Sequence, residues 1–430
     1  MKNKSLTPQI RFKGYDDEWQ QAKVRDVFTL GNGYTPSKAN PAFWTNGTIP
    51  WFRMEDIREN GRVLADSIQH VTPEAVKSSG LFPAGSIIVS TTATIGEHAL
   101  LIADSLANQQ FTVFQTVNRW SWLKAKYLLY RFYGLGDWCR KNVNAGGLAA
   151  VSITDLQKYD IDFPSTAEER DSIADYFDNI DKLLVDTERE ITRLEKMKQA
   201  SLQKMFPRPG ETTPEIRFDG FTEPWKKVTF SDVFTPLKNN TLSRDCLNYT
   251  SGMAKNIHYG DVLIKFGAVI NINDEIVPYV NETVSFSQSP FHLLKDGDII
   301  FADTAEDEAV GKCVEIIGAT EFNSVSGLHT IAVRPNFSFA PSFLGYYLNS
   351  STYHSQLLPL MQGVKVLSIG RNALATTEIC YPTSHEEQCV IGEYFRNLDA
   401  IISAKRKKLE KLQNLKQSCL DKMFVNTTAQ

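Results

Sequence analysis

The chain repeats two of its own segments, and this duplication restricts the folds open to it more than any other feature. Residues 8–28 and 214–234 share Ile, Arg, Phe, Gly and Trp at a constant offset, together with a closing Asp-Val-Phe. A longer repeat relates residues 168–206 to residues 386–424 without a gap, with 14 of 39 positions identical. The sequence therefore predicts two tandem halves, each built from a short segment, a long middle and a long helix.

Both copies of the longer repeat show the heptad pattern of a coiled coil, with mostly apolar residues at positions a and d. Apolar residues at position g, Leu183 and Met197 in the first copy and Ile401 and Leu415 in the second, widen each stripe, so that a third or fourth helix can pack there. A helix pair inside an ordinary core is the alternative, although helices of this length are uncommon there. The residues expected at the helix and partner interface are Phe177, Leu184, Ile191, Leu194, Met205, Phe395, Ile402, Leu409, Leu412 and Met423.

Breaker residues between the repeats set the domain boundaries. PRPGETTP at 207–214 is expected to end the first helix and to link the halves. The predicted fold class is mixed α/β, with two α+β domains separated by two long antiparallel coiled-coil helices in a chain with an internal pseudo-two-fold duplication. The expected parts are a first domain (1–165), a helix (166–206), a linker (207–213), a second domain (214–383), a second helix (384–424) and a tail (425–430).

The charges in the middle of each helix agree with an antiparallel arrangement, which brings the two helix centres together. The first helix is acidic there and the second is basic, so we expect ion pairs that help orientation more than stability. The residues concerned are Asp186, Glu188 and Glu190 on the first helix, and Lys405, Arg406, Lys407 and Lys408 on the second.

The two middles share a framework but differ in polar decoration. Each has a Gly turn before an apolar strand, PAGSIIVS in the first and KDGDIIFA in the second. The polar stretches differ, as NQQF at 108–111 and SGLH at 326–329 show. A duplicated fold with unlike surfaces suggests one task performed on two unlike targets.

Composition supports a globular protein with reduced cysteines. The 430 residues are 42% hydrophobic and 22% charged, with no run of 18 apolar residues and no leader sequence, so we expect a cytoplasmic protein. The six cysteines form no CxxC pair, which argues against a zinc knuckle or a disulfide framework.

Motifs for catalysis are missing from the sequence. GNGYTPSK at 31–38 lacks the spacing of a phosphate-binding loop, and the Asn-Pro-Pro-aromatic signature of an adenine amino-methyltransferase is absent. The seven histidines show no metal-ligand spacing. We therefore expect no catalytic residue, no metal site and no cofactor in this chain.

The twofold order of segment, variable middle and helix resembles the specificity subunit of type I restriction-modification enzymes. The resemblance rests on IRFKGY and IRFDGF, each followed by Trp, and on the helix sequence EEQCVIGEYF…LKQSCLDKMF, and it covers the whole chain. It implies two target-recognition domains, each reading one part of a split, asymmetric site in double-stranded DNA. It also implies two adenine-N6 methyltransferase subunits and restriction/translocase subunits as partners, which bring S-adenosylmethionine, ATP and magnesium, while this chain itself is not an enzyme.

Charge alone does not indicate DNA binding. The net charge is −4; the first middle (29–163) has 12 basic and 11 acidic residues, and the second (235–381) has 9 and 14. A DNA-binding domain usually shows a basic excess. Either the basic residues gather on one face, or the partners supply most phosphate contacts. A coiled-coil scaffold with two peptide- or ligand-binding domains, and an unaided nuclease or methyltransferase, are the competing interpretations.

Base-reading candidates follow from hydrogen-bonding chemistry, because amides suit adenine and arginine suits guanine in the major groove. In the first middle these are Thr92, Thr94, Asn108, Gln109, Gln110, Asn142 and Asn144, and in the second Thr304, Asn323, Lys365, Arg371 and Asn372.

Overall fold

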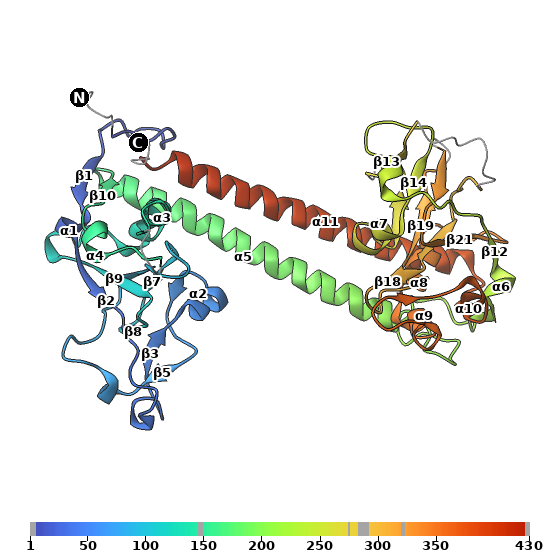
Figure 1. Cartoon of the computed structure of the whole chain (residues 1–430), viewed down its shortest axis with the longest axis horizontal. Helices are drawn as coiled ribbons and strands as arrows, with labels where there is room; N and C mark the ends of the chain where they lie inside the picture. The colour runs from blue at the N-terminus through green and yellow to red at the C-terminus, as the bar shows by residue number, and fades with distance from the viewer. Residues whose placement is uncertain (1–5, 145–148, 274–275, 283–291, 320–322, 426–430) are drawn as a thin grey trace. The chain divides into compact units, whose positions relative to one another are not determined.

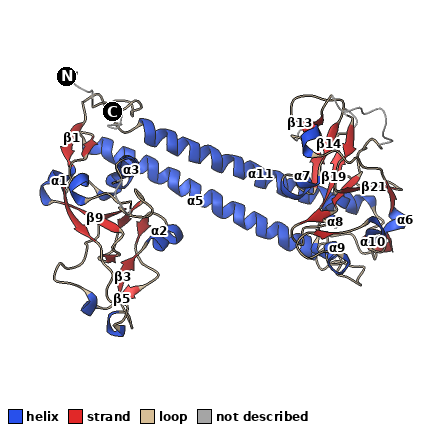
Figure 2. Ribbon diagram, in the orientation of Figure 1, coloured by secondary structure: helices blue, strands red, loops and turns tan. Residues whose placement is uncertain are grey.

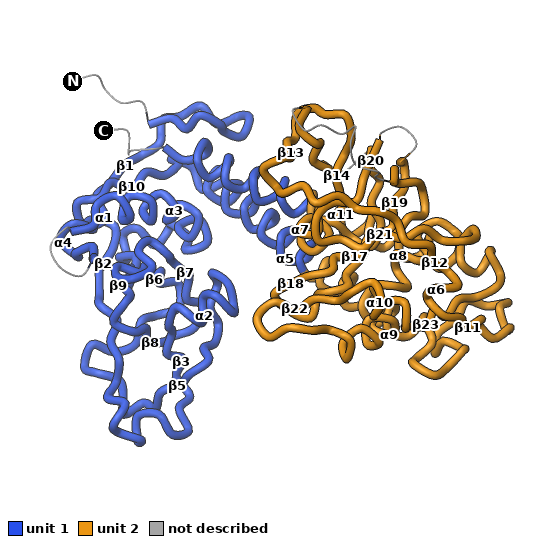
Figure 3. Tube along the Cα trace, turned by 45° about the vertical axis from the view of Figure 1, so that its right-hand side comes forward, with its two compact units in different colours: residues 1–188, 408–430 blue, residues 189–407 orange. Residues whose placement is uncertain are grey.

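The computed structural model describes residues 6–144, 149–273, 276–282, 292–319 and 323–425. The chain forms two compact units, which Figure 3 shows in different colours: unit 1 holds residues 1–188 and 408–430, and unit 2 holds residues 189–407. Each unit therefore contains one part of both long helices. The tail expected over 425–430 lies outside the described residues except for Val425.

Unit 1 is built around a five-stranded sheet in the order β2-β9-β6-β7-β4. A three-stranded sheet, β5-β3-β8, and the antiparallel pair β1-β10 complete its strands, and α3 covers the central sheet through contacts with β6 and β7 (Figure 1). The elements are β1 (Gln20–Lys23), α1 (Val24–Val27), β2 (Phe28–Asn32), β3 (Ile49–Phe52), α2 (Met54–Asn60), β4 (Val63–Leu64), β5 (His70–Val71), β6 (Ile87–Ser90), β7 (His98–Leu101), β8 (Leu106–Ala107), β9 (Phe111–Thr116), α3 (Ala125–Lys141), α4 (Ile153–Leu156) and β10 (Asp160–Phe163).

Unit 2 repeats this plan with a five-stranded sheet in the order β12-β21-β17-β19-β15 and the antiparallel pair β11-β23. A four-stranded sheet, β13-β16-β14-β20, and the pair β18-β22 accompany it. The elements are β11 (Lys226–Thr229), α6 (Phe230–Val233), β12 (Phe234–Pro236), β13 (Leu247–Asn248), β14 (Lys255–Ile257), α7 (Tyr259–Ile264), β15 (Val269–Asn271), β16 (Tyr279–Val280), β17 (Ile299–Ala302), β18 (Thr304–Ala305), β19 (Cys313–Ile317), β20 (Ser324–Ser326), β21 (Thr330–Pro335), α8 (Phe343–Leu348), α9 (Ser351–His354), β22 (Leu367–Ser368), α10 (Arg371–Ala375) and β23 (Glu378–Tyr381).

The two long helices are α5 (Ala167–Lys204) and α11 (His385–Lys422), each 38 residues long (Figure 2). Both begin in the same way, because a hydroxyl accepts a backbone N–H of the first turn: Thr166 from Glu169 at 3.4 Å, and Ser384 from Glu387 at 3.2 Å. Within each unit the two helices run antiparallel. The predicted fold class, two α+β domains with long antiparallel helices, is confirmed.

The heptad residues form the seam between the helices in each unit. The phenylalanines, isoleucines and methionines among them are buried, and the four leucines are half-buried. The buried ones are Phe177, Ile191, Met205, Phe395, Ile402 and Met423; the half-buried ones are Leu184, Leu194, Leu409 and Leu412.

The position-g residues, in contrast, are exposed. Leu183 and Leu415 of unit 1 are 46% and 45% exposed, and Met197 and Ile401 of unit 2 are 42% and 47% exposed. An apolar strip therefore remains uncovered on the helices of each unit.

A buried ion pair ties the first segment of each half to the start of its long helix. In unit 1 Arg11 donates to both carboxylate oxygens of Glu169, at 2.6 and 2.8 Å, and the indole of Trp19 donates to the same carboxylate. In unit 2 Arg217 makes the same two bonds to Glu387, at 2.7 and 2.8 Å, and Trp225 takes the place of Trp19. The shorter sequence repeat therefore encodes a structural clamp.

The ends of the helices are also held by repeated contacts. Phe424, at the end of α11, stacks on Phe177 of α5 with ring centroids 5.8 Å apart, and Phe206 stacks on Phe395 at the same distance. The backbone N–H of Ile10 donates to Lys422, as that of Ile216 donates to Lys204.

Ion pairs between α5 and α11 repeat too. Lys198 bonds Asp399 in unit 2, and its equivalent Lys416 bonds Asp181 in unit 1, both at 2.5 Å. Of the mid-helix pairs expected from the sequence, Lys405 pairs with Glu190. Arg406 differs from the expectation, because it pairs with Glu195, further along α5, at 2.5 Å.

Two further sequence expectations concern the cysteines and membranes. All six cysteines are free thiols, and four of them are buried. Within the part of the chain that the structure describes, no helix is both long and apolar enough to cross a membrane.

Candidate functional site

Three loops meet at the end of β6 in unit 1. The loop after β6 (91–97) makes one backbone hydrogen bond to each of the other two loops: the N–H of Thr91 donates to Gln110 O at 2.9 Å, and that of Val151 donates to Thr91 O at 3.0 Å. Thr92 also forms an isolated bridge with Ala150. We call the site where residues 91–97, 107–110, 142–144 and 149–152 meet the loop junction of unit 1.

Unit 2 has the same junction at the end of β17. The backbone N–H of Asp303 donates to His329 O at 3.1 Å, and that of Ile369 donates to Asp303 O at 2.9 Å. Thr304 of β18 pairs with Ser368 of β22, in the place of the bridge from Thr92 to Ala150. The loop junction of unit 2 therefore comprises residues 303–311, 327–329 and 361–372.

The structure brings together all seven base-reading candidates of unit 1. Their side chains lie in the three loops of the junction. Asn108 and Gln110 bond each other, since the Asn108 side-chain amide donates to Gln110 Oε1 at 3.3 Å and Gln110 N donates to Asn108 Oδ1 at 3.0 Å. Gln109, Asn142 and Asn144 are exposed, while Thr92, Thr94, Asn108 and Gln110 are half-buried.

Four of the five candidates of unit 2 lie in its junction. Thr304 and Lys365 belong to segments joined by the β18–β22 pair, and Arg371 and Asn372 follow at the start of α10. Asn323 lies apart, at the start of β20, where its carbonyl accepts the backbone N–H of Lys255 at 2.8 Å. The three residues of β20 separate it from the junction by about 10 Å.

Sequence reasoning missed several polar side chains at these junctions. In unit 1 the hydroxyl of Thr35 bonds Gln109 Oε1, and Lys38 lies over the rings of Trp44 and Trp51, at 4.1 and 4.8 Å from their centroids. Both residues belong to GNGYTPSK at 31–38, which the sequence analysis considered only as a possible phosphate-binding loop. Thr35 and Gln109 are 74 positions apart, so no local signal indicates their contact, whereas Lys38 lies outside the three loops and contacts rings that follow closely in the sequence.

In unit 2 the missed residues are Asn239, Asp303 and His329. Arg371 donates to Asn239 Oδ1 at 2.9 Å, and Asn239 in turn donates to Gly327 O at 3.3 Å. His329 Nδ1 lies 3.3 Å from Asp303 Oδ1. The junction of unit 2 therefore carries ionisable groups where that of unit 1 carries amides.

Strained backbone marks both junctions. Ala93 has φ +58° in unit 1, and His329 has φ +53° in unit 2. Residues other than glycine rarely adopt this left-handed conformation, and such strain tends to gather at functional sites.

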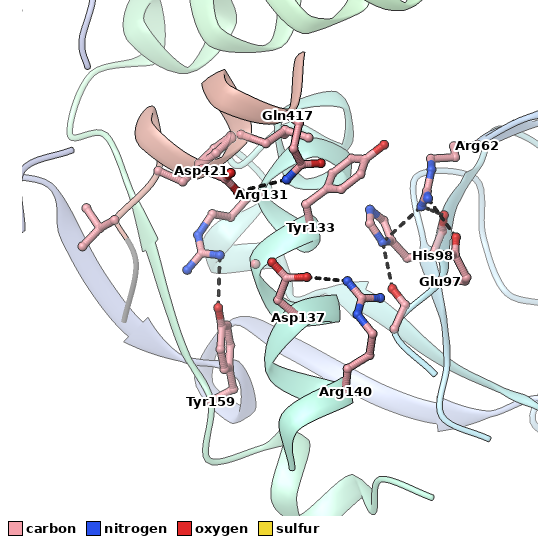
Figure 4. A pocket seen from close by; sticks show the side chains of 15 residues that line it. Arg62, Glu97, His98, Arg131, Tyr133, Asp137, Arg140, Tyr159, Gln417 and Asp421 are labelled. Carbon is pink, nitrogen blue, oxygen red and sulfur yellow. Dashed lines mark hydrogen bonds and ion pairs between the residues drawn. The ribbon is translucent and has the colours of Figure 1, made fainter. Parts of the chain in front are cut away.

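A cavity of about 440 Å³ in unit 1 lies between α3, the start of β7 and the end of α11 (Figure 4). Its arginines have acidic partners: Arg62 bonds Glu97 at 2.8 Å, and Arg140 bonds Asp137. Burial, helped by the charge of Arg62, lowers the pKa of His98 to about 3, so this neutral imidazole donates from Nε2 to Leu129 O at 2.9 Å. With its charges paired, the cavity is a poor match for a phosphate.

Metal binding finds no support in the described ranges, where no group of three His, Cys, Asp or Glu side chains could hold an ion. The loop junctions, which combine exposed hydrogen-bonding groups with a fixed backbone, are therefore the candidate site of each unit.

Comparison with known proteins agrees with a duplicated recognition chain. A family model described as "Type I restriction modification DNA specificity domain" matches residues 16–196 and again residues 222–414. The EcoprrI type I restriction enzyme specificity subunit of Escherichia coli is 45% identical over 162 residues, covering 37% of this chain and 40% of the relative. The EcoR124I/EcoR124II specificity subunit of the same organism is 29% identical over 215 residues, covering 46% of this chain and 51% of that protein. The chain thus aligns with about half the length of these relatives.

Among solved structures, the S subunit of a type I restriction-modification system from M. genitalium superposes with a TM-score of 0.56 at 14% identity. The match covers 98% of this chain and 100% of that one, so the folds are alike.

Proposed function

Because the chain belongs to the type I restriction-modification DNA specificity family, we propose that it is the DNA sequence-recognition subunit of such a complex. Each unit reads one half of a bipartite, asymmetric site through its loop junction. The observation that carries this proposal is that the same backbone junction occurs in both units with different side chains. Because the backbone of the junction is the same in both units, each unit is oriented on the DNA in the same way. The different side chains then select different bases.

The side chains suggest what each half-site contains. The junction of unit 1 offers amides and hydroxyls, such as Asn108 and Gln109, which suit adenine edges. That of unit 2 offers Arg371 and Lys365, which suit the O6 and N7 acceptors of guanine. The two half-sites are therefore expected to differ in sequence.

The helices dock the partner subunits. Each unit exposes the same pair of apolar positions, Leu183 with Leu415 in unit 1 and Ile401 with Met197 in unit 2. One copy of a methyltransferase subunit per unit would cover them, which gives two copies for the whole chain. Restriction/translocase subunits join this assembly for cleavage.

Catalysis and most of the phosphate contacts come from the partners. The chain carries a net charge of −4, so it is a weak electrostatic partner for DNA on its own. We assign S-adenosylmethionine, ATP and magnesium to the partner subunits, and this chain is the non-catalytic subunit of an adenine-N6 methyltransferase and endonuclease.

The long helices set the spacer between the half-sites. Helix α5 passes from unit 1 into unit 2, and its 38 residues measure about 57 Å at about 1.5 Å per residue. Half-sites on one face of the duplex, about one helical turn or 34 Å apart, are within reach of two units joined by such a helix.

Exchange of a middle tests the assignment. Residues 29–163 are replaced by the matching segment of another family member, the chain is co-expressed with its methyltransferase subunit, and modified adenines are sequenced. One half-site should change and the other should persist. If the methylated sequence were unchanged at both half-sites, or altered at both, the proposal that each unit reads one half-site would be refuted.

A further inference from the structure

His329 occupies a tight turn that holds its backbone in an unfavourable conformation. Its φ of +53° is unusual for a residue with a Cβ. The turn is closed by Thr330, whose hydroxyl donates to Gly327 O at 2.5 Å and lies 2.6 Å from the Ser326 hydroxyl. Glycine would adopt this backbone at no steric cost, so a histidine here suggests a use for the side chain.

The imidazole is oriented from two sides. Its Nδ1 lies 3.3 Å from Asp303 Oδ1, and that carboxylate also accepts a hydrogen bond from the Thr304 hydroxyl at 2.8 Å. The ring meets Tyr259 edge to face, with centroids 5.2 Å apart. The side chain nevertheless stays 48% exposed. Since Nδ1 faces Asp303, Nε2 is on the opposite side of the ring.

The same turn also positions Arg371. Asn239 connects the two, because its side chain donates to Gly327 O and accepts from the Arg371 guanidinium at 2.9 Å. A histidine of this turn and an arginine of α10 that Asn239 joins to it are thus both held in the unit 2 loop junction.

We propose that His329 is a specificity-determining residue of unit 2, whose Nε2 hydrogen-bonds one base edge of the second half-site, with Asp303 as its positioning residue. This inference rests on the proposed function. When the ring carries its proton on Nδ1, beside the Asp303 carboxylate, a neutral imidazole accepts at Nε2 from the exocyclic amine of adenine or cytosine, and a protonated one donates to guanine N7 or O6. The neighbouring carboxylate makes a phosphate an unfavourable partner for the ring.

The test uses His329→Gly, which removes the side chain and leaves a residue suited to the turn. Asp303→Asn removes the charge that orients the ring. Asn46→Gly in unit 1 is the matched control, because it removes a polar side chain from the same backbone conformation, φ +57°, at a position outside the loop junction. Each variant is assembled with the methyltransferase subunits and selected against duplexes randomised in both half-sites, and thermal melting checks its fold.

For His329→Gly we expect about 5- to 100-fold less discrimination at one base pair of the second half-site, with the first half-site unchanged. Asp303→Asn should weaken the preference at that same base pair, and Asn46→Gly should leave both half-sites as they were. The base that is no longer preferred identifies the hydrogen bond of His329: a base with an exocyclic amine shows that the imidazole accepts, and guanine shows that it donates.

An unchanged base profile for His329→Gly would overturn the proposal. So would an equal loss of affinity for every duplex, because that result fits a phosphate contact or a structural role. If the unaltered complex showed no split sequence preference at all, the proposed function would fall, and this inference with it.

Discussion

The clamp between the first segment of each half and the long helix offers a test of what holds the units together. In unit 2 the carboxylate of Glu387 is 1% exposed and accepts both bonds from Arg217 and one from the Trp225 indole at 3.2 Å. The replacement Arg217→Met keeps most of the apolar stem and removes the positive charge. The buried carboxylate is then left without its charged partner.

The expected cost follows from this burial. Breaking a buried ion pair by removing one partner costs about 3–5 kcal/mol, because the remaining charge has lost its water. The same replacement at Arg208, which pairs with Glu215 at the surface with side chains 66% and 41% exposed, should cost less than about 1 kcal/mol. The contrast between two arginines in one unit isolates the effect of burial.

Urea unfolding of the full chain measures the difference, and hydrogen exchange across residues 215–225 tests whether the segment leaves the helix. Arg217→Met should expose this segment and lower the unfolding free energy well below that of Arg208→Met. The double replacement Arg217→Met with Glu387→Leu should recover most of the loss. Equal effects of the two single replacements would show that the clamp is not a stabilising buried pair.

Three further outcomes are expected. Inserting one heptad near Thr187 lengthens α5 by about 10 Å, so methylation mapping should find both half-site sequences retained with a longer spacer. Altered bases with the old spacer would refute the role of α5 in setting the spacer. Charge reversal by Glu190→Lys should cost about 0.2–1 kcal/mol, and adding Lys405→Glu should restore the melting temperature if the pair orients the helices. Burial raises the pKa of Glu315 to about 7 from 4.5, so folding favours its neutral form and the unfolding free energy should fall by about 3 kcal/mol as pH rises from 4.5 through 7. Urea titrations at both pH values should show this slope weakened in Glu315→Gln, and a slope as steep as that of the unaltered chain would contradict the assignment.

The helices could be predicted from the sequence because their signals are local and repeated. The heptad pattern recurs over both copies of the long repeat, and each copy starts after a hydroxyl residue, Thr166 or Ser384, that caps it. The duplication then supplied the antiparallel order. The partner of Arg406 was not predictable in this way, since it depends on the register between two helices and on which rotamers meet.

The loop junctions were only partly predictable because they depend on contacts between distant residues. Thr304 is brought to Ser368 by strand pairing across more than sixty positions, and neither residue signals the other. Asn323 belongs to the same polar stretch as the junction turn, yet β20 carries it to the opposite end. His329 was overlooked because a left-handed conformation leaves no mark on a histidine in the sequence.

Some contacts between a domain and the long helices are the same in both units, and others differ. Tyr130 and Tyr346 both donate to an aspartate of the helix seam, Asp181 at 3.1 Å and Asp399 at 2.8 Å. The residue that follows this tyrosine differs between the units. In unit 1 it is the buried Arg131, which pairs with a carboxylate, and in unit 2 it is a tyrosine.

These contacts indicate which residues must be kept when residues 29–163 are exchanged for those of another family member. The partner of Arg131 is Asp162, which lies in the same middle and travels with it, so the buried charge stays paired after an exchange of 29–163. The hydroxyl of Tyr130, in contrast, reaches outside the middle to the helix seam. A donor middle with a tyrosine at this place should therefore dock on the resident helices, whereas one without it would remove this hydrogen bond and leave the half-buried Asp181 paired with Lys416 in the seam. The polar side chains of the junctions can vary more readily, because neither the clamp ion pairs nor the tyrosine hydrogen bonds to the seam involve them.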